Sequence, residues 1–404
     1  MANYANWGDS ELYCQMAFGG NLASIHSKEE NRLLLEKIAG DTCNIWLGGK
    51  GVSGSEDFYW IDNTDWDYKN WELGEPNNMG NEDCLEGNHR GPPGGWNDRA
   101  CHYKFTSICE LKLKSKILVF GGYNPIDKLL DTVETVYTNK PFLGQINPEL
   151  MLEKTAESTI GLIGDSIYFA GGVTENQVAT NLLQMYDISS RRFYYRPPMK
   201  EIRRGAGGVV YKNKFCVCGG TGSYGFPILK SCECLEPSSN YWYGIGEMNV
   251  GRAEFAMTSL DDVIYAVSGW PYDAKISAEK YDWTTGKWSL MAGMEQGVSN
   301  FGLVTFASQL FACGGYNGSV TLSKCEIYDP STNSWSWGPS MVTDRAYFGM
   351  VLQGNRLVAI GGWSSEFGYL YNVESLEDSY WRTSETRLQY SRYKLSAVTI
   401  TFNE

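Results

Sequence analysis

A run of apolar residues that ends in two small residues recurs along most of the chain. It occurs six times, as ILVFGG (117–122), IYFAGG (167–172), FCVCGG (215–220), IYAVSG (264–269), LFACGG (310–315) and LVAIGG (357–362). The doublets follow one another at intervals of 46 to 50 residues. Short apolar runs bounded by turn residues are typical of buried strands. We therefore predict a series of β-rich repeats over residues 117–404.

Two further markers keep the register of the doublets. A methionine stands 20 residues before five of them, at Met151, Met199, Met248, Met294 and Met341. Aromatic residues follow at fixed places: Tyr186 with Phe193, Tyr281 with Trp288, Tyr328 with Trp335, and Trp242 and Trp381 alone. A core between stacked sheets needs side chains of this size. We expect these aromatic residues to lie between neighbouring repeats.

The repeat resembles the kelch propeller family, in which each repeat of about 50 residues forms one four-stranded blade. The resemblance covers residues 117–402 and implies an all-β propeller of six blades. The segment YKLSAVTITF (393–402) alternates like an inner strand, but no doublet follows it. Because a ring has to hide its edge strands, we expect this C-terminal strand to complete the first blade and close the propeller.

Residues 7–111 follow a different pattern. Two stretches of helical periodicity lie within residues 9–40, and the apolar strand NIWLGG (44–49) follows. A long region rich in Gly, Asn and Trp comes next and is typical of loops. We predict an α+β domain over residues 1–111, a short linker over 112–116 and the propeller over 117–404.

Six motifs of this first domain occur in the order found in C-type lectin domains, which the domain therefore resembles. They are LASIHSKEEN (22–31), IWLGG (45–49), GEPNN (74–78), EDC (82–84), WND (96–98) and SICE (107–110). The resemblance implies disulfides between Cys14 and Cys109 and between Cys84 and Cys101. The family opens with a strand that we do not find before the first helix, so we expect the N-terminus to be incomplete.

The resemblance also implies a calcium site that binds sugar. Calcium takes about six to eight oxygen ligands, and the family's ligand positions correspond to Glu75, Asn77, Glu82, Asn97 and Asp98, with Pro76 as a cis proline. The order Glu-Pro-Asn implies mannose, N-acetylglucosamine or fucose, whose vicinal equatorial hydroxyls would bind the ion. A second calcium ion is doubtful, because GKGVSGSED (49–57) has Gly and Ser where the family's acids align.

Six cysteines of the repeats form three regularly placed pairs: Cys216/Cys234, Cys218/Cys232 and Cys313/Cys325. The first two pairs have the same sum of residue numbers, which marks directly opposed residues in an antiparallel hairpin. They are possible disulfides, and small buried thiols are the alternative. Cys43 is left as a single, buried thiol.

Two sets of loop residues are expected to meet on one face of the propeller. Aromatic residues follow the doublets and arginines precede the inner strands: Tyr123, Tyr224, Trp270, Tyr272, Tyr316 and Trp363, with Arg203, Arg204, Arg252, Arg345 and Arg392. Arginines beside aromatic rings suit an acidic peptide or a glycan. The alternative, which we favour, is that each arginine braces its own blade through backbone carbonyl groups.

Composition narrows the possible functions. The 404 residues carry a net charge of −13, which argues against a nucleic-acid partner. The three histidines all lie in the first domain, so the propeller has no His-based catalytic triad or histidine-ligated metal. We find no membrane span and no signal peptide in this chain. The expected disulfides and the sequon Asn317-Gly318-Ser319 favour an extracellular protein.

We predict a calcium-dependent carbohydrate-binding protein whose propeller engages an unknown protein or a glycan, in extracellular recognition or adhesion. The alternative is a protein-interaction scaffold whose lectin-like domain binds no sugar. An enzyme is not expected, because no nucleophile elbow, phosphate loop or pair of catalytic carboxylates is found.

Overall fold

The computed structural model describes residues 2–18, 20–32, 34–35, 44–52, 55–80, 82–88, 95–110, 114–126, 128–137, 144–271, 274, 276–377 and 379–402. The chain divides into two compact units: the first comprises residues up to Lys114 together with the C-terminal residues from Thr401, and the second comprises Ser115–Ile400. Cys43, His89 and Tyr272 lie outside the described residues. Among the residues described, no helix is long and apolar enough to cross a lipid bilayer.

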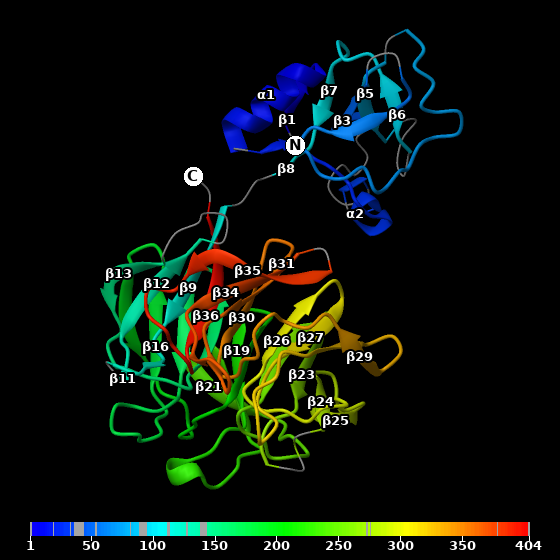
Figure 1. The fold of residues 1–404 in the computed structure, drawn as a ribbon. Coiled ribbons are helices and arrows are strands. Elements are labelled where there is room, and N and C mark those ends of the chain that lie inside the picture. The colour runs from blue at the N-terminus through cyan, green and yellow to red at the C-terminus, as the bar shows by residue number, and fades with distance from the viewer. Residues whose placement is uncertain are drawn as a thin grey trace. The chain divides into compact units, whose positions relative to one another are not determined.

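The first unit combines helices with a mixed sheet (Figure 1). Its helices are α1 (Trp7–Phe18) and α2 (Lys28–Arg32). The sheet has the order β1 (Ala2–Ala5), β7 (Phe105–Ser107), β3 (Ile45–Gly51), β5 (Cys84–Gly87) and β6 (Asn97–Arg99), and β4 (Phe58–Trp60) pairs with β3. A separate ladder joins β2 (Asn21–Leu22) to β8 (Cys109–Glu110). The sequence predicts no strand before the first helix, and this prediction is wrong, because β1 pairs with β7.

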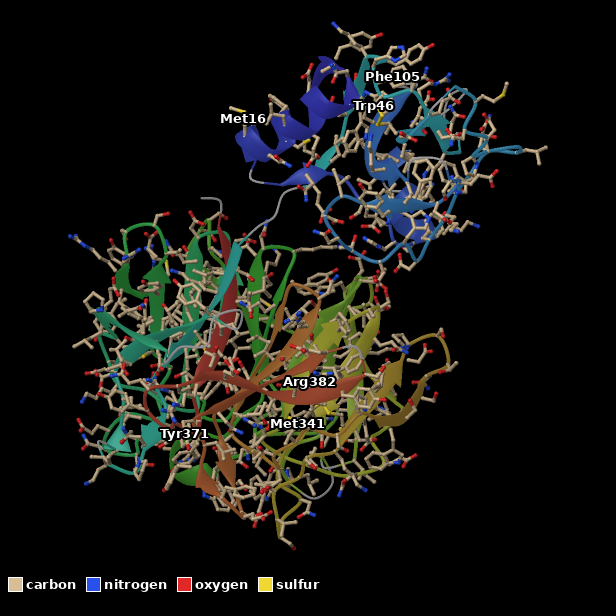
Figure 2. The ribbon with its side chains drawn as sticks, turned by 45° about the horizontal axis from the view of Figure 1, so that its top comes forward. Met16, Trp46, Phe105, Met341, Tyr371 and Arg382 are labelled. Carbon is tan, nitrogen blue, oxygen red and sulfur yellow. A yellow bond between two sulfur atoms is a disulfide. The ribbon has the colours of Figure 1, made fainter. Side chains whose placement is uncertain are left out.

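The core of the first unit explains why its central strand reads Ile-Trp-Leu-Gly-Gly. Trp46 packs on Phe105 with ring centroids 4.7 Å apart (Figure 2). A Cβ at Gly48 would lie 2.4 Å from the carbonyl oxygen of Leu22, and a Cβ at Gly49 would lie 2.6 Å from the side chain of Leu85. The two glycines therefore let neighbouring segments approach the strand closely.

Within the described residues, the second unit contains six four-stranded sheets, here called sheets 1 to 6. Sheet 1 is β13 (Gln145–Leu150), β12 (Thr132–Val136), β9 (Lys114–Phe120) and β36 (Ser396–Phe402); sheet 2 is β14 (Thr159–Ile163), β15 (Ser166–Ala170), β16 (Leu183–Asp187) and β17 (Arg192–Arg196). Sheet 3 is β18 (Gly207–Tyr211), β19 (Lys214–Cys218), β20 (Cys232–Glu236) and β21 (Tyr241–Ile245); sheet 4 is β22 (Ala256–Leu260), β23 (Val263–Val267), β24 (Ala278–Asp282) and β25 (Lys287–Met291). Sheet 5 is β26 (Gly302–Phe306), β27 (Gln309–Cys313), β28 (Cys325–Asp329) and β29 (Ser334–Gly338); sheet 6 is β30 (Gly349–Gln353), β31 (Arg356–Ile360), β34 (Asn372–Glu377) and β35 (Tyr380–Arg387).

Short elements occupy some connections of the second unit. They are the pair β10 (Tyr123–Asn124) and β11 (Lys128–Leu129), the pair β32 (Trp363–Ser364) and β33 (Gly368–Tyr369), and a 3₁₀ turn at Ser223–Gly225. Strand β9 begins at Lys114, so the last three residues of the expected linker belong to sheet 1. One end strand of each sheet is here called its inner strand: β36 in sheet 1, and β14, β18, β22, β26 and β30 in sheets 2 to 6. Each apolar run that precedes a doublet forms the strand that pairs with this inner strand.

Hydrophobic clusters join the sheets in sequence. Sheets 1 and 2 share Phe120, Phe169 and Phe193, and four further clusters join sheets 2 to 6 in the same way. Another cluster contains Val119 of sheet 1 and Val358 of sheet 6. The predicted aromatic residues lie in these clusters, and the indole N–H groups of Trp242, Trp288, Trp335 and Trp381 each donate to a backbone carbonyl that follows the preceding sheet.

Neighbouring connections pack closely against the glycine doublets, as Gly171 and Gly172 illustrate. Gly171 and Gly172 have φ angles of 67° and 94°. A Cβ at Gly171 would lie 2.4 Å from the carbonyl oxygen of Arg203, and one at Gly172 would lie 2.4 Å from that of Ala156. Both the left-handed backbone and the close approach therefore require glycine.

A series of backbone hydrogen bonds links the connections that enter the sheets. The residue two positions before each inner strand has a left-handed backbone. These residues are Glu157, Gly205, Glu254, Asn300, Tyr347 and Lys394. The N–H groups of Glu254, Asn300, Tyr347 and Lys394 each donate to the carbonyl of the preceding member, at 2.7 to 2.9 Å, and Glu157 donates to Lys394 at 3.4 Å. The last bond joins the entry of sheet 2 to that of sheet 1.

Candidate functional site

Asp98, at the middle of β6, holds the loop that contains the Glu-Pro-Asn motif. Its carboxylate is fully buried and accepts the backbone N–H groups of Asn77, at 3.0 Å, and Asn78. The peptide bond between Glu75 and Pro76 is cis, as predicted. Because two successive N–H groups bind one buried carboxylate, the backbone after Pro76 is fixed beside β6.

The side chains on either side of Pro76 meet each other. The amide of Asn77 donates to Oε2 of Glu75, while its oxygen accepts the backbone N–H of Met79 at 2.9 Å. Asn77 is exposed and Glu75 is half-buried. Two oxygen-bearing side chains are thus presented together at the surface of the first unit.

Glu82 and Asn97 complete the predicted ligand set. Burial, and to a smaller extent the Asp98 carboxylate, raise the pKa of Glu82, although Arg99, whose Nη1 lies 3.9 Å from Glu82 Oε1, acts in the opposite direction. Asn97 is buried, and its amide donates to Oε2 of Glu86 at 2.9 Å. The side chain of Asn97 is therefore oriented by Glu86.

The donor set fits calcium by chemical type. Three carboxylates and two amides are the oxygen donors that calcium prefers. The pKa of Glu82 is raised first by burial and then by the neighbouring Asp98 carboxylate, so two of these carboxylates lie near each other. In the described part of the chain, however, no three acidic, histidine or cysteine side chains are arranged as a metal cage. Asn77, Glu75 and Asp98 are in contact through hydrogen bonds, whereas Asn97 is bonded to Glu86.

Five disulfides are formed in the described residues. They join Cys14 to Cys109, Cys84 to Cys101, Cys216 to Cys234, Cys218 to Cys232 and Cys313 to Cys325. These are the pairs that the sequence suggests. The last three cross adjacent strands of sheets 3 and 5.

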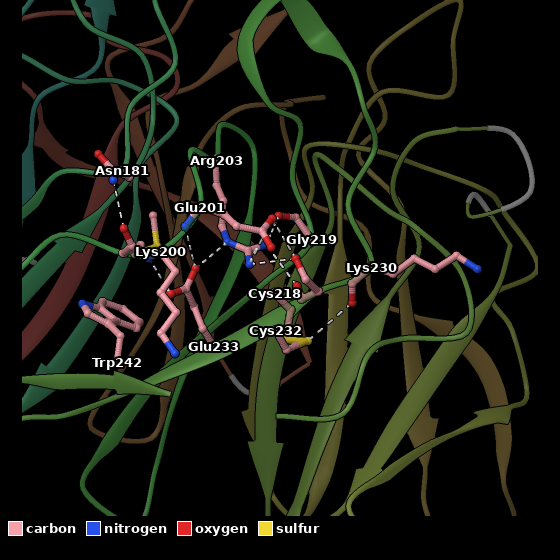
Figure 3. Close-up of polar contacts among 12 residues, drawn as sticks. Asn181, Lys200, Glu201, Arg203, Cys218, Gly219, Lys230, Cys232, Glu233 and Trp242 are labelled. Carbon is pink, nitrogen blue, oxygen red and sulfur yellow. Dashed lines mark hydrogen bonds and ion pairs between the residues drawn. A yellow bond between two sulfur atoms is a disulfide. The ribbon is translucent and has the colours of Figure 1, made fainter. Parts of the chain in front are cut away.

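Four arginines of the second unit have the bracing role that we favour from the sequence. Arg203 is 1% exposed, and its Nη1 donates to the carbonyls of Gly219 and Ser231, at 2.8 and 3.0 Å. Its Nε donates to Glu233 at 3.2 Å, as Figure 3 shows. All of these partners belong to the connection or strand of sheet 3, which Arg203 itself precedes.

Three further arginines repeat this arrangement. Arg252, Arg345 and Arg392 are fully buried. Their Nη1 atoms donate to the carbonyls of Ser268, Gly361 and Gly121, and their Nη2 atoms contact Glu279, Glu374 and Glu134. A buried cation needs a carboxylate and hydrogen-bond acceptors around it. These four arginines therefore brace their own sheets, as the alternative reading of the sequence has it, and do not form a binding face.

The remaining residues of the expected face are more accessible. Arg204 is partly exposed and donates two hydrogen bonds to Glu157, at 2.9 and 3.0 Å. Trp270 is 37% exposed, whereas Tyr123, Tyr316 and Trp363 are half-buried. The side chain of Tyr224 lies outside the description.

Apart from Trp270, the exposed apolar side chains in the connections after the doublets were not predicted from the sequence. Each of the six connections contributes at least one, and these are Ile126, Val178, Phe226, Trp270, Val320 and Phe367. Their exposed fractions range from 37% to 81%.

Comparison with known proteins agrees with the division of the chain into two units. The family model described as the lectin C-type domain matches residues 3–111, and the kelch motif matches residues 297–342. The second unit resembles the solved structure of YjhT, with a TM-score of 0.55 and 15% identity over 66% of this chain and 96% of that one. At this identity the likeness concerns the fold alone.

Curated lectins are among the proteins that match the first unit. The protein named lectin from Pleurodeles waltl is 41% identical over 113 residues, which are 27% of this chain and 65% of the relative, so the match spans less than two thirds of that protein. The lactose-binding lectin l-2 of Anguilla japonica is 37% identical over 118 residues, which are 28% of this chain and 70% of the relative. Through residues 3–111 the chain belongs to the C-type lectin family, and an all-β region that resembles a kelch propeller follows.

Proposed function

We propose that the chain binds carbohydrate through a calcium ion held by Glu75, Asn77, Glu82, Asn97 and Asp98. The observation that carries the proposal is the double hydrogen bond from the backbone of Asn77 and Asn78 to the buried Asp98 carboxylate. It keeps Glu75 and Asn77 next to β6, which carries two of the other proposed ligands. A bound calcium ion would accept the hydroxyl oxygens of a sugar as further ligands.

We propose a mannose-type sugar, with vicinal equatorial hydroxyls, as the ligand. The order Glu75-Pro76-Asn77 supports this choice through the resemblance described above. The name of the eel relative, a lactose-binding lectin, supports a galactose-type ligand instead. The two classes differ in the orientation of the 4-hydroxyl, so one experiment separates them.

The test is binding of the full chain to immobilised mannose and lactose glycans, with calcium and then with a chelator. Mannose binding that disappears with the chelator and in Asn77→Asp is the expected result. Asn70→Asp, in the same unit, is a matched control that should bind as the parent does. Stronger lactose than mannose binding would overturn the sugar class, and binding that survives chelation would overturn the calcium site.

For the second unit we propose a closed propeller of six blades. Support comes from the pairing of β36 with β9 and from the cluster that contains Val119 and Val358. Further support comes from the backbone bond that joins Glu157 to Lys394. A closed ring of blades leaves only short, protected strand edges.

We propose that the connections after the doublets dock a protein partner. The exposed side chains of Phe226, Trp270 and Phe367 support this, because surface aromatic residues gather at interaction sites. If the first domain binds no sugar, protein binding at this surface is the alternative function of the chain. Selection of displayed peptides against the full chain tests it: enrichment should be lost in the double variant Phe226→Ser/Phe367→Ser and kept in Tyr194→Ser. Absence of any enriched peptide would count against the proposal.

We further propose an extracellular setting and a binding function without catalysis. The five disulfides support the setting, since such bonds persist in oxidising compartments. Expression through a secretory pathway should therefore give a folded chain, whereas expression in a reducing cytosol should lower the yield.

A further inference from the structure

A cavity of about 130 Å³ lies between sheets 1 and 2. Strands β9, β12, β13 and β36 line it from sheet 1, and β16 with the turn after it lines it from sheet 2. Its described lining residues all belong to the second unit. Because the lining residues Gln145, Pro148 and Arg191 are exposed, solvent reaches the cavity.

The gap between sheets 3 and 4 shows what fills the same place elsewhere. There Tyr211, at the end of β18, stacks on Trp283 with ring centroids 4.9 Å apart. Tyr243 of β21 packs against the same cluster. Three aromatic rings thus occupy the space between those two sheets.

The register of the repeats identifies smaller or polar counterparts beside the cavity. Ile400 follows Arg392 by eight residues as Tyr211 follows Arg203, and Ile188 follows Tyr186 by two as Trp283 follows Tyr281. Gln145 pairs with the residue after Glu134 as Tyr243 pairs with the residue after Glu233. Two isoleucines and a glutamine therefore stand where the gap between sheets 3 and 4 has three aromatic residues, so less side-chain volume is present beside the cavity.

One buried polar atom of the lining, on Glu149, lacks a hydrogen-bond partner in the described structure, and the Tyr186 side chain lines the same cavity. Tyr186 is 3% exposed, and no hydrogen bond of its hydroxyl is found among the described residues. In sheet 5 the equivalent hydroxyl of Tyr328 donates to Asn333 at 2.9 Å, but Arg191 takes the place of that asparagine in sheet 2. Oε2 of Glu149 is buried without a hydrogen-bond partner in the same description. Buried polar groups of this kind call for a bound polar molecule.

The charges around the cavity have both signs. Lys116 of β9 and Arg191 are cationic, and Glu149 of β13 is anionic. Their proximity is seen in the pKa of Lys116, which is lowered first by burial and then by Arg191, while Glu149 opposes the change. A ligand that carries one group of each sign would match this lining.

We propose that the cavity binds a small zwitterionic α-amino acid such as glycine, alanine or serine. The carboxylate of the ligand would face Lys116 and Arg191, and its ammonium group would donate to Glu149 and to the oxygen of Tyr186. The volume suits the size, because a cavity of about 150 Å³ takes up one benzene molecule of six carbon atoms. This site is independent of the sugar site.

Calorimetric titration of the full chain tests the proposal. Glycine, alanine and serine are the probes; lactate replaces the ammonium group by a hydroxyl, and ethanolamine lacks the carboxylate. Binding of the amino acids, unchanged by a calcium chelator, is expected. Binding of lactate or ethanolamine as tight as that of alanine, or no binding of any amino acid at millimolar concentration, would overturn the assignment.

Three variants locate the binding. Tyr186→Phe keeps the ring and should weaken alanine binding about fivefold, and Glu149→Gln should weaken it about tenfold or more. Gln145→Tyr restores the aromatic residue of sheet 3 and should abolish binding while the fold is retained. Tyr328→Phe, which removes the equivalent hydroxyl of sheet 5, is the matched control. Alanine binding that survives Gln145→Tyr would place the ligand elsewhere and overturn the proposal.

Discussion

Nη2 of Arg252 lies 2.7 Å from Oε1 of Glu279, and both side chains are fully buried. The same carboxylate accepts the backbone N–H groups of Asn249 and Val250, at 2.7 and 3.0 Å. Glu279, a residue of sheet 4, therefore links the backbone of the connection that precedes this sheet to the side chain of Arg252. Sheets 1, 3 and 6 contain the same pairing of an arginine with a glutamate.

Replacement of Arg252 by methionine should destabilise the second unit strongly. It leaves the Glu279 carboxylate buried without its cation, which costs about 3–5 kcal/mol in comparable cases. The midpoint of denaturant unfolding measures the effect. Arg382→Met is the control, because that side chain is 65% exposed and should change the free energy of unfolding by less than about 0.5 kcal/mol. Equal effects of the two substitutions would contradict a bracing role.

Sheet 5 departs from this pattern and gives a prediction about pH. Val298 stands where sheets 3, 4 and 6 have the bracing arginine, and Glu326 accepts the backbone N–H groups of Glu295 and Gln296, at 2.8 and 2.9 Å. Burial is the main cause that raises the pKa of Glu326, and the two N–H groups oppose it. The folded chain thus holds this proton more tightly than the unfolded chain does. The associated stability is complete below the unfolded pKa and is lost as pH rises through the folded pKa.

Glu326→Gln should therefore gain stability relative to the parent as pH is raised from about 4 to about 8. Gln184, at the equivalent place in sheet 2, shows that an amide fits: it accepts the N–H of Glu153 and donates to its carbonyl, at 2.8 and 2.9 Å. Thermal unfolding across this pH range is the measurement. Glu385→Gln, on an exposed residue, should give a difference that does not vary with pH in this way, and a flat profile for Glu326→Gln would refute the argument.

How far the sequence predicts the structure depends on how local the constraint is. The strands before the doublets and the glycines themselves could be predicted, because a left-handed backbone and a close approach restrict a position to one residue type. The bracing role of Arg203 was favoured but not decided by the sequence, since an arginine repeated at one place fits both a face and a brace until its partner Glu233 is located in space. Strand β1 was missed because Ala2–Ala5 has little pattern of its own and is defined by its pairing with β7.

Within the candidate site, too, some features could be predicted from the sequence and others could not. The Glu-Pro-Asn motif and the cysteine pairs leave recognisable spacings in the sequence. The hydrogen bonds from Asn77 and Asn78 to Asp98 do not, because they join residues 20 or 21 positions apart. The cavity beside Tyr186 could not be predicted either, since it results from side chains that are absent rather than from a motif.

Ile400 of β36 tests the contribution of the C-terminal strand. It is 4% exposed and packs in the cluster that contains Phe120 and Ile167. Ile400→Ala should lower the free energy of unfolding by about 2 kcal/mol or more, because buried isoleucine to alanine changes remove packing and leave a void. The exposed Thr401→Ala is the neighbouring control. Unfolding midpoints that agree within error would show that β36 contributes little to the second unit.

Calcium should stabilise the first unit, and Asp98 should be required for that effect. A ligand that binds only the folded state raises the free energy of unfolding by about 2.7 kcal/mol at a hundredfold excess over its dissociation constant. In Asp98→Asn one carboxylate oxygen becomes an N–H donor, so at most one of the backbone N–H groups of Asn77 and Asn78 keeps its acceptor, and a proposed ligand loses its charge. We expect thermal unfolding of the parent to shift upward with calcium and back with chelator, and the variant to show a smaller shift. Asp65→Asn, on an exposed residue of the same unit, should respond as the parent does. If Asp98→Asn kept the full calcium shift, the ion would be bound at another place in the chain.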